Sequence, residues 1–164
     1  MRTKAKIRIR HYRGRGVHSP FAYGIVRNVR MDAKPLPDVS PLYSYLHETG
    51  MADKTASFIQ RLFTYMECSE CEIDGKILDG IVADTEGPGM TILTPAIDEC
   101  ISTEMQIAAH SDKRIVVLTE PRKTLRRNKM CCAIVSGHRG LSIDCCGTIV
   151  VFNTSGLNDQ HIKL

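Results

Sequence analysis

Residues 115–152 read IVVLTEPRKTLRRNKMCCAIVSGHRGLSIDCCGTIVVF, and the order of segments in this stretch decides the class of fold. Residues 115–118 form a continuous apolar run, which is typical of a strand buried on both faces. Residues 121–135 predict a helix with basic residues near its start. Residues 141–145 and 148–152 predict two strands, and the two residues between them allow only an antiparallel pair. Strand, helix and hairpin in this order predict an α/β fold.

The segment before this stretch continues the α/β pattern. Residues 77–83 and 90–93 are short apolar runs that predict two strands, with a turn at residues 86–89 between them. Thr94-Pro95 predicts the start of a helix, because a proline fits the first helical position. We therefore assign residues 71–164 to an α/β portion of the chain.

The N-terminal part of the chain predicts helices. Ser19-Pro20 and Ser40-Pro41 each place a capping serine before a proline at the first helical position. Asp53 is the expected cap of a third helix, whose apolar residues follow helical spacing. These helices define a helical portion over residues 17–70, and a basic arm over residues 1–16 precedes it.

Length and composition indicate one globular domain. The chain has 164 residues, of which 43% are hydrophobic and 24% charged, and these are ordinary values for a globular protein. No run of 18 apolar residues occurs, so we expect no membrane-spanning helix. The basic N-terminus lacks the apolar core of a signal peptide, and we therefore expect a cytoplasmic protein.

Charge is concentrated at the N-terminus. Residues 1–30 carry nine Lys/Arg and no Asp or Glu, whereas the remaining 134 residues carry 13 Lys/Arg against 18 Asp/Glu. A basic arm of this kind is typical of contact with nucleic acid or an acidic surface. The candidate contact residues are Arg8, Arg10, Arg13 and Arg15. Two alternatives stay open: the arm folds back onto its own acidic body, or it is simply solvated.

Seven cysteines are present, and we expect them to be reduced thiols. Cys68 and Cys71 have the spacing of zinc ligands, but no second Cys-x-x-Cys or His pair completes a site. Because reduced cysteine behaves as a small hydrophobic residue, core packing accounts for most of the seven. We therefore expect no metal.

Both ends of the chain resemble one family. Residues 13–21, RGRGVHSPF, resemble the N-terminal HG-V-HSPF segment of a group of bacterial class I SAM-dependent methyltransferase-like proteins. Residues 140–144 and 147–152 are similar to that family's closing hairpin, and Gln160-His161 is similar to its terminal KQH segment. The resemblance implies a Rossmann-like sheet, truncated here, that ends in an antiparallel hairpin.

The cofactor loop of that family is the feature that the sequence lacks. The resemblance calls for a strand ending in an acidic residue, then a glycine loop that opens a helix. Asp79 and Gly80 supply the acid and one glycine, but the apolar run continues after them. Gly87 and Gly89 flank a proline and precede a strand. These four residues are the candidate cofactor contacts, and we expect no bound cofactor, or SAM if the protein is active.

Two residues are candidates for catalysis. His18 lies in the family-like segment, and Glu120 follows a predicted strand; each also has a structural interpretation, as a turn-forming histidine and as an acid at a helix start. The leading hypothesis is a degenerate, non-catalytic methyltransferase-like protein that acts through protein interaction, for example as a homodimer paired along an exposed sheet edge. One alternative is an active SAM-dependent methyltransferase, which a pocket next to Asp79 or Glu120 would favour. The other is a nucleic-acid-binding module that uses the basic arm.

Overall fold

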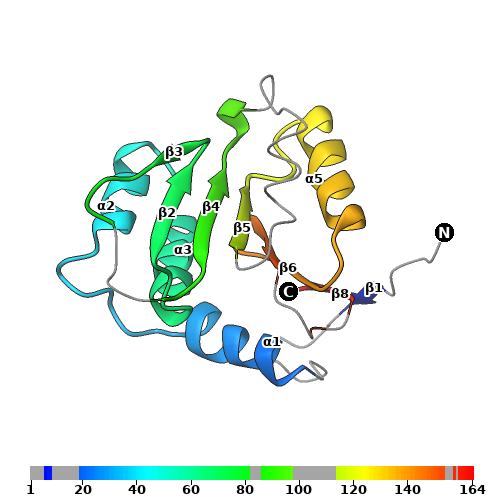
Figure 1. Cartoon of the computed structure of the whole chain (residues 1–164), viewed down its shortest axis with the longest axis horizontal. Helices are drawn as coiled ribbons and strands as arrows, with labels where there is room; N and C mark the ends of the chain where they lie inside the picture. Colours follow the sequence, from blue (N-terminus) through cyan, green and yellow to red (C-terminus); the bar gives the residue numbers. More distant parts are fainter. Residues whose placement is uncertain (1–5, 9–18, 82–85, 98–113, 154–156, 158) are drawn as a thin grey trace.

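A computed structural model describes residues 6–8, 19–81, 86–97, 114–153, 157 and 159–164. These residues form a mixed α/β fold around one eight-stranded sheet (Figure 1). The helical elements are α1 (Pro20–Ile25), a π-helical turn η1 (Val26–Arg30), α2 (Pro41–Glu48), α3 (Asp53–Tyr65), a 3-10 turn η2 (Pro95–Ile97) and α5 (Leu125–Gly137). The strands are β1 (Lys6–Arg8), β2 (Glu70–Ile73), β3 (Lys76–Ile77), β4 (Gly89–Leu93), β5 (Arg114–Thr119), β6 (Leu141–Cys145), β7 (Thr148–Phe152) and β8 (Gln160–Lys163).

The sheet has the strand order β1-β8-β6-β7-β5-β4-β2-β3. Strands β2, β4 and β5 are parallel neighbours, and β7 lies antiparallel between β5 and β6. Strand β6 therefore runs in the same direction as β5, and α5 makes the connection between them. The carboxyl ends of β2, β4, β5 and β6 all reach the same edge of the sheet.

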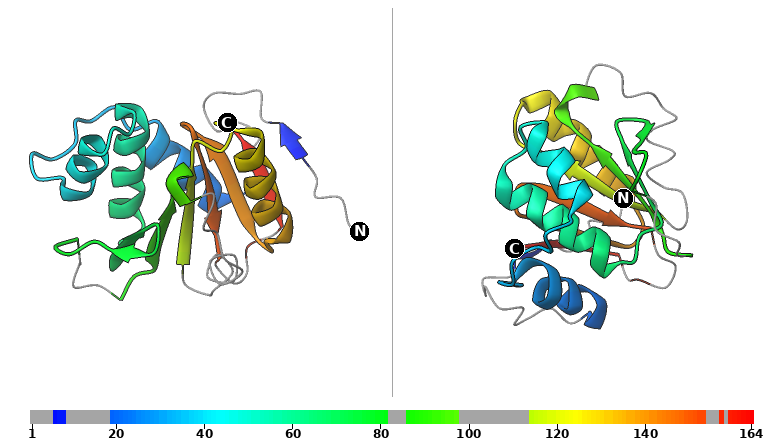
Figure 2. Two further views of the ribbon diagram at one scale, coloured as in Figure 1. Left: turned by 90° about the horizontal axis from the view of Figure 1, so that it is seen from above. Right: turned by 90° about the vertical axis from the view of Figure 1, so that its left-hand side faces the viewer.

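Helices cover the sheet on both faces, with α2 and α3 on one side and α5 on the other (Figure 2). The larger core lies between the sheet and helices α1, α2 and α3, and it includes Ile25, Leu42, Ile59, Cys71, Ile92, Val117 and Phe152. The smaller core lies beneath α5 and includes Leu93, Val116, Leu118, Cys131, Ile134 and Val151. Among the described residues, no helix is both long and apolar enough to cross a membrane.

The predicted hairpin and the strand before it are confirmed. Strand β5 pairs with β7 and β7 with β6, both antiparallel. Cys146 and Gly147 make the connecting turn with φ angles of 52° and 76°. Positive φ at both central positions suits the right-handed twist of a two-residue hairpin.

The helical N-terminal portion is also confirmed, with two corrections at the caps. The Ser19 side chain accepts a hydrogen bond from the Ala22 amide and caps α1 as predicted. Ser40 precedes α2, but its hydroxyl donates to the Pro37 carbonyl and does not cap the helix. Asp53 is the first helical residue of α3 and not its cap, which is Ala52. A carboxylate in the first turn still interacts favourably with the helix dipole.

The strand predicted over residues 77–83 is wrong at residues 78–81, which are not in a strand, and residues 82 and 83 lie outside the described residues. The strand in this region is β2, which lies earlier in the sequence. After β2 the chain turns at Asp74-Gly75 and forms the two-residue strand β3, antiparallel to β2. The apolar character after β3 has another cause, because Ile81 is a loop residue whose side chain is buried in the main core.

One predicted helix begins later than expected, and the predicted start of another is confirmed. Helix α5 begins at Leu125 and not at residue 121, because the Thr124 side chain caps it by accepting from the Arg127 amide. Thr94-Pro95 does begin a helical turn, the 3-10 segment η2. The rest of the helix predicted there lies outside the described residues.

Two further strands, β8 and β1, were also not expected from the sequence. Strand β8 adds to β6 in parallel, and β1, from the predicted basic arm, adds to β8. Ser142 Oγ and His161 Nδ1 lie 2.8 Å apart and fasten β8 to β6. Ser142 is fully buried, so this pair offers no nucleophile to solvent. The sheet thus continues past the hairpin that the sequence predicted as its end.

Candidate functional site

A cavity of about 580 Å³ lies at the carboxyl edge of the parallel strands β2, β4 and β5. Open α/β sheets bind ligands at this edge, in the crevice beyond the strand ends. The lining residues come from α2, the α2–α3 connection, α3 and the three strand ends: Leu46, Thr49, Gly50, Met51, Ala52, Thr55, Ile73, Asp74, Thr94, Pro95, Ala96, Thr119, Glu120 and Lys123.

Asp74 is the acidic residue at the end of β2. Its Oδ1 accepts a hydrogen bond from the Thr94 amide at 2.8 Å, and its Oδ2 accepts one from the Thr94 hydroxyl at 2.6 Å. Asp74 and Gly75 have φ angles of 50° and 84°, which form the tight turn into β3. Both carboxylate oxygens are thus engaged with the neighbouring strand end, and the carboxylate joins β2 to β4.

Arg127, on α5, contacts the ends of β4 and β5. Its side chain is fully buried and donates hydrogen bonds to the carbonyls of Leu93, Thr94 and Thr119. Carbonyls at strand ends have no ladder partner of their own, and a buried carbonyl needs a donor. One guanidinium therefore fixes the ends of β4 and β5, and with them the shape of the cavity.

Glu120 and Lys123 form the charged part of the cavity lining. Lys123 Nζ lies 3.1 Å from Glu120 Oε2, and both side chains are about half exposed. Glu120 has a φ of 45°, and its amide donates to the Gly147 carbonyl in the hairpin turn. An exposed ion pair of this kind is weak, so either group can turn to a ligand at small cost.

Helices α2 and α3 supply the remaining wall. Leu46 and Met51 present apolar side chains, and Gly50 ends α2 with a φ of 85°. Thr55, in the first turn of α3, donates its hydroxyl to the Cys146 carbonyl at 2.9 Å. This bond ties the cavity wall to the hairpin turn between β6 and β7.

The cavity is equipped for binding a small polar molecule. Its lining combines apolar walls with hydroxyls, two carboxylates and one ammonium, and its volume is within the range of small-ligand sites. Among the described lining residues there is no cysteine, histidine or serine. The carboxylates of Asp74 and Glu120 and the ammonium of Lys123 are the described candidates for proton transfer, and Asp74 is held by Thr94.

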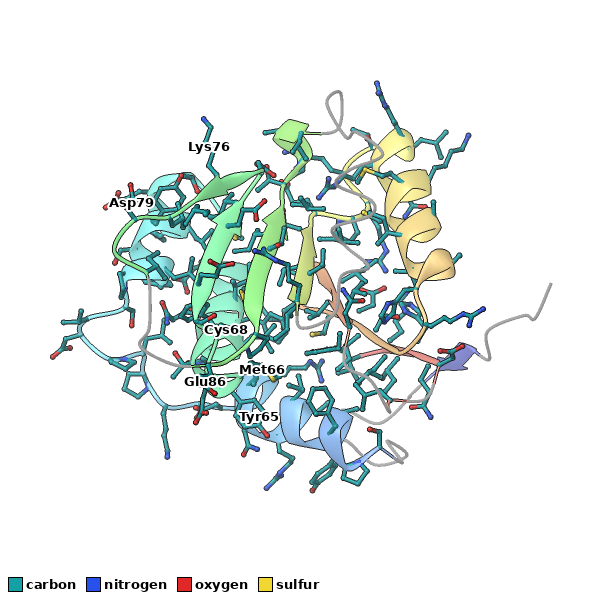
Figure 3. The ribbon with its side chains drawn as sticks, in the orientation of Figure 1. Tyr65, Met66, Cys68, Lys76, Asp79 and Glu86 are labelled. Carbon is teal, nitrogen blue, oxygen red and sulfur yellow. The ribbon has the colours of Figure 1, made fainter. Side chains whose placement is uncertain are left out.

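Of the described residues predicted for a cofactor or catalysis, Glu120 alone is among those that line the cavity. Asp79 and Gly80 lie in an exposed turn after β3, and Figure 3 shows Asp79 on the outer side of that strand. Gly87 accepts a hydrogen bond from the Ser69 hydroxyl, and Gly89 is the first residue of β4. Both glycines are therefore near the amino edge of the sheet, opposite the cavity.

The two cysteines with zinc-like spacing are packed in the main core. Cys68 and Cys71 are buried, and burial raises the pKa of each thiol to about 12. A zinc site needs deprotonated thiols. In the described part of the chain, no three His, Cys, Asp or Glu side chains gather as a metal site.

Four predicted site residues lie outside the described residues: His18, Arg10, Arg13 and Arg15. Arg8 is the last residue of β1, and its side chain is not among those described. Neither the catalytic prediction for His18 nor the nucleic-acid prediction for the arm is therefore tested.

Asp74 was not among the site residues predicted from the sequence, although its position has a recognisable signal. The chain contains two Asp-Gly dipeptides, Asp74-Gly75 and Asp79-Gly80, and Asp-Gly is a strong signal for a hairpin turn. The first follows Glu70–Ile73, where buried and partly exposed side chains alternate. The prediction placed the end of the strand at the second dipeptide. It therefore chose Asp79 as the acidic residue, five positions after Asp74.

No protein-family model, curated protein or solved structure matches this chain.

Proposed function

We propose that this chain is a shortened, Rossmann-like relative of the methyltransferase-like proteins that does not methylate and acts through protein interaction. One observation carries the non-catalytic part: after β2 the chain turns at Asp74-Gly75 directly into the antiparallel strand β3. A cofactor-binding α/β fold needs a glycine loop and a helix N-terminus at this position. Here a hairpin occupies it, and the acidic side chain is bonded to Thr94.

Strand order supports the Rossmann-like part of the proposal. Parallel strands β2, β4 and β5 share a carboxyl edge, and α5 crosses from β5 to the parallel strand β6. The resemblance also implies a closing hairpin, and β6 and β7 form a hairpin at the matching residues. Strand β8 then follows at the residues similar to the family's terminal segment.

A free sheet edge supports the interaction part. Within the described part of the chain, strand β3 is the edge strand next to β2 and pairs on one side only. Its Ile77 side chain is 58% exposed. An apolar side chain on an unpaired edge favours pairing with another chain, so a second copy of this protein is the first partner to test.

The cavity itself favours a second candidate function, an active SAM-dependent methyltransferase with an atypical cofactor site. Its volume of about 580 Å³ suits a ligand of this size, and Glu120 lines it. In this alternative the Glu120 carboxylate binds the cofactor, and Asp74 leaves Thr94 to do so too.

Thermal unfolding with and without SAM separates the two functions. A cofactor present at about a hundredfold excess over its Kd adds about 2.7 kcal/mol to the stability of the folded state. For a domain of this size that corresponds to a rise in Tm of roughly 5–10 °C. The non-catalytic proposal expects no rise at a SAM concentration of about 1 mM, which would reveal a Kd of about 10 μM.

The variant Glu120→Gln shows whether any rise comes from the cavity. A reproducible rise in Tm that this variant loses contradicts the non-catalytic proposal and establishes the second candidate. Lys76→Gln is the matched control, because Lys76 is exposed on β3 and does not line the cavity.

A further inference from the structure

The hairpin turn between β6 and β7 brings two thiols together. Cys145 is the last residue of β6 and is buried, whereas Cys146 is the first turn residue and is half-buried. The two side chains are hydrogen-bonded to each other. One thiol of the pair is thus within reach of solvent, with a second, protected thiol beside it.

Positive groups from two other elements converge on Cys146. Arg30, the last residue of η1, hydrogen-bonds the Cys146 side chain, and Lys54, in the first turn of α3, acts on it through its charge. The N-terminus of α3 also faces this turn, because Thr55 donates to the Cys146 carbonyl. Reactive cysteines occur in partly exposed, electropositive surroundings of this kind.

These surroundings act differently on the two thiols. The hydrogen bond from Cys145 and the charges of Lys54 and Arg30 lower the pKa of Cys146 to about 6. The pKa of Cys145 is raised, by its hydrogen bond to Cys146 and by burial, with a further contribution from the Asp144 carboxylate. Asp144 is itself paired with Arg122, which restrains its charge. Of the two thiols, Cys146 is therefore the one that ionises first.

We propose that Cys146 and Cys145 form a redox pair that reduces hydroperoxides, with Cys146 as the nucleophile and Cys145 as the resolving thiol. The proposal is independent of the function proposed above, because it concerns the hairpin turn and not the cavity. Hydroperoxides are the substrate class, because a small oxidant reaches a half-buried sulfur and needs no shaped pocket.

The chemistry balances in two steps. The Cys146 thiolate attacks one peroxide oxygen, so an S–O bond forms, the O–O bond breaks, and the leaving alkoxide or hydroxide takes up a proton. The Cys145 sulfur then attacks the Cys146 sulfenic acid, so an S–S bond forms and the S–O bond breaks. The hydroxyl group leaves with the Cys145 proton as water. Two thiols are oxidised by two electrons, and the peroxide is reduced to an alcohol and water.

The resulting bond should be easy to reduce. Neighbouring Cα atoms are about 3.8 Å apart, which is closer than the usual separation of about 4.4–6.8 Å between disulfide-bonded residues. Strained disulfides have higher reduction potentials and are the labile ones. A small dithiol should therefore restore the pair, so the turn is able to cycle.

Mass spectrometry of the peroxide-treated chain tests the proposal. The peptide that contains Cys145 and Cys146 is expected to lose two hydrogen atoms and to regain them with dithiothreitol. Cys132 is the internal control, since it is exposed on α5, where its thiol contacts the Asn128 side-chain oxygen. In Cys145→Ser the sulfenic acid on Cys146 should persist and react with dimedone, and in Cys146→Ser neither product should form.

The charge around Cys146 supplies a second readout that does not depend on disulfide formation. Lys54→Gln is expected to slow alkylation of Cys146 by iodoacetamide about threefold near pH 5, below the thiol pKa, because losing the charge raises that pKa by about half a unit. Lys76→Gln, remote on β3, should leave the rate unchanged. The proposal is overturned if Cys132 is oxidised at least as fast as the pair, or if Cys145→Ser yields no dimedone adduct while the variant remains folded by circular dichroism.

Discussion

Arg127 is the single side chain on which the cavity edge depends most. It is fully buried, and its guanidinium donates to carbonyls at the ends of β4 and β5. Arg127→Met keeps much of the side chain's volume but leaves these carbonyls without their donor. Hydrogen bonds from a charged group contribute about 1.5–3 kcal/mol each. We expect the free energy of unfolding to fall by about 3 kcal/mol or more in urea denaturation.

The neighbouring arginine provides the control for this experiment. Arg126 is exposed on the same helix, so Arg126→Met should change the free energy of unfolding by no more than about 0.5 kcal/mol. Equal losses in the two variants would show that the effect comes from the helix and not from the carbonyl contacts.

The buried thiols of Cys68 and Cys71 make stability depend on alkaline pH. Burial raises the pKa of each to about 12 from an ordinary value of 9.0. Between these values the unfolded chain loses the proton and the folded chain keeps it, so the folded state loses stability as pH rises. Each thiol steepens the fall by up to about 1.4 kcal/mol per pH unit.

The variant Cys71→Ala isolates this effect. Urea denaturation between about pH 8 and 11 should show a shallower decline of stability with pH in this variant than in the natural chain. Cys132→Ala, at an exposed position on α5, should keep the natural slope. If the free energy of unfolding of Cys71→Ala fell with pH as steeply as that of the natural chain, the Cys71 thiol would not stay protonated in the folded chain.

At the scale of the element, the sequence predicted those strands that have a clear apolar pattern or a very short connection. Strand β5 is a continuous apolar run, and β6 and β7 are separated by only two residues, so their structure and pairing follow from local rules. Strands β2 and β8 are short and carry charged or polar residues, so their pairing depends on neighbours distant in sequence. Local patterns hold no information about such partners.

The candidate site divides in the same way. Glu120 was predictable, because it follows the strong strand β5 directly. Asp74 was not found, because the strand that carries it is weak and a second Asp-Gly follows five residues later. The bond between Asp74 and Thr94 and the contacts of Arg127 join separate strands. Spacing in the sequence cannot indicate contacts of this kind.

Helix α1 allows a direct test of how firmly the N-terminal helices are docked. Ile25 is 1% exposed in the main core, and Ile25→Ala should cost about 2–5 kcal/mol of stability. Phe21 is only half-buried, with its ring edge-on to Phe152 at 5.1 Å between centroids. Phe21→Ala should therefore cost less than the roughly 3–5 kcal/mol expected for a fully buried phenylalanine.

Chemical denaturation of these variants is compared with Tyr23→Ala, whose side chain is 44% exposed on the same helix. We expect a change of no more than about 0.5 kcal/mol there. A loss below about 1 kcal/mol in Ile25→Ala would show that α1 contributes little to the folded core.

At the scale of the whole molecule, the two free edges of the described sheet limit how copies can associate. One edge is β1, with three residues, and the other is β3, with two. Short edge strands and an edge lysine, here Lys76, are common protections against pairing. Ile77, beside that lysine, is 58% exposed, and this apolar side chain favours pairing instead. An interface built on so few residues is small, and small interfaces are weak.

We therefore expect a weak homodimer through β3 that forms only at high protein concentration. Sedimentation equilibrium over a dilution series should show an average mass that rises from that of a monomer with increasing concentration. Ile77→Lys adds a second positive charge at the edge and should hold the chain monomeric at every concentration, because like charges would face each other across the pair. Leu125→Lys, at a residue 73% exposed on α5, is the control and should associate like the natural chain. Association that Ile77→Lys leaves unchanged would place the interface elsewhere, and a monomeric natural chain at the highest concentration would remove the homodimer from the proposed function.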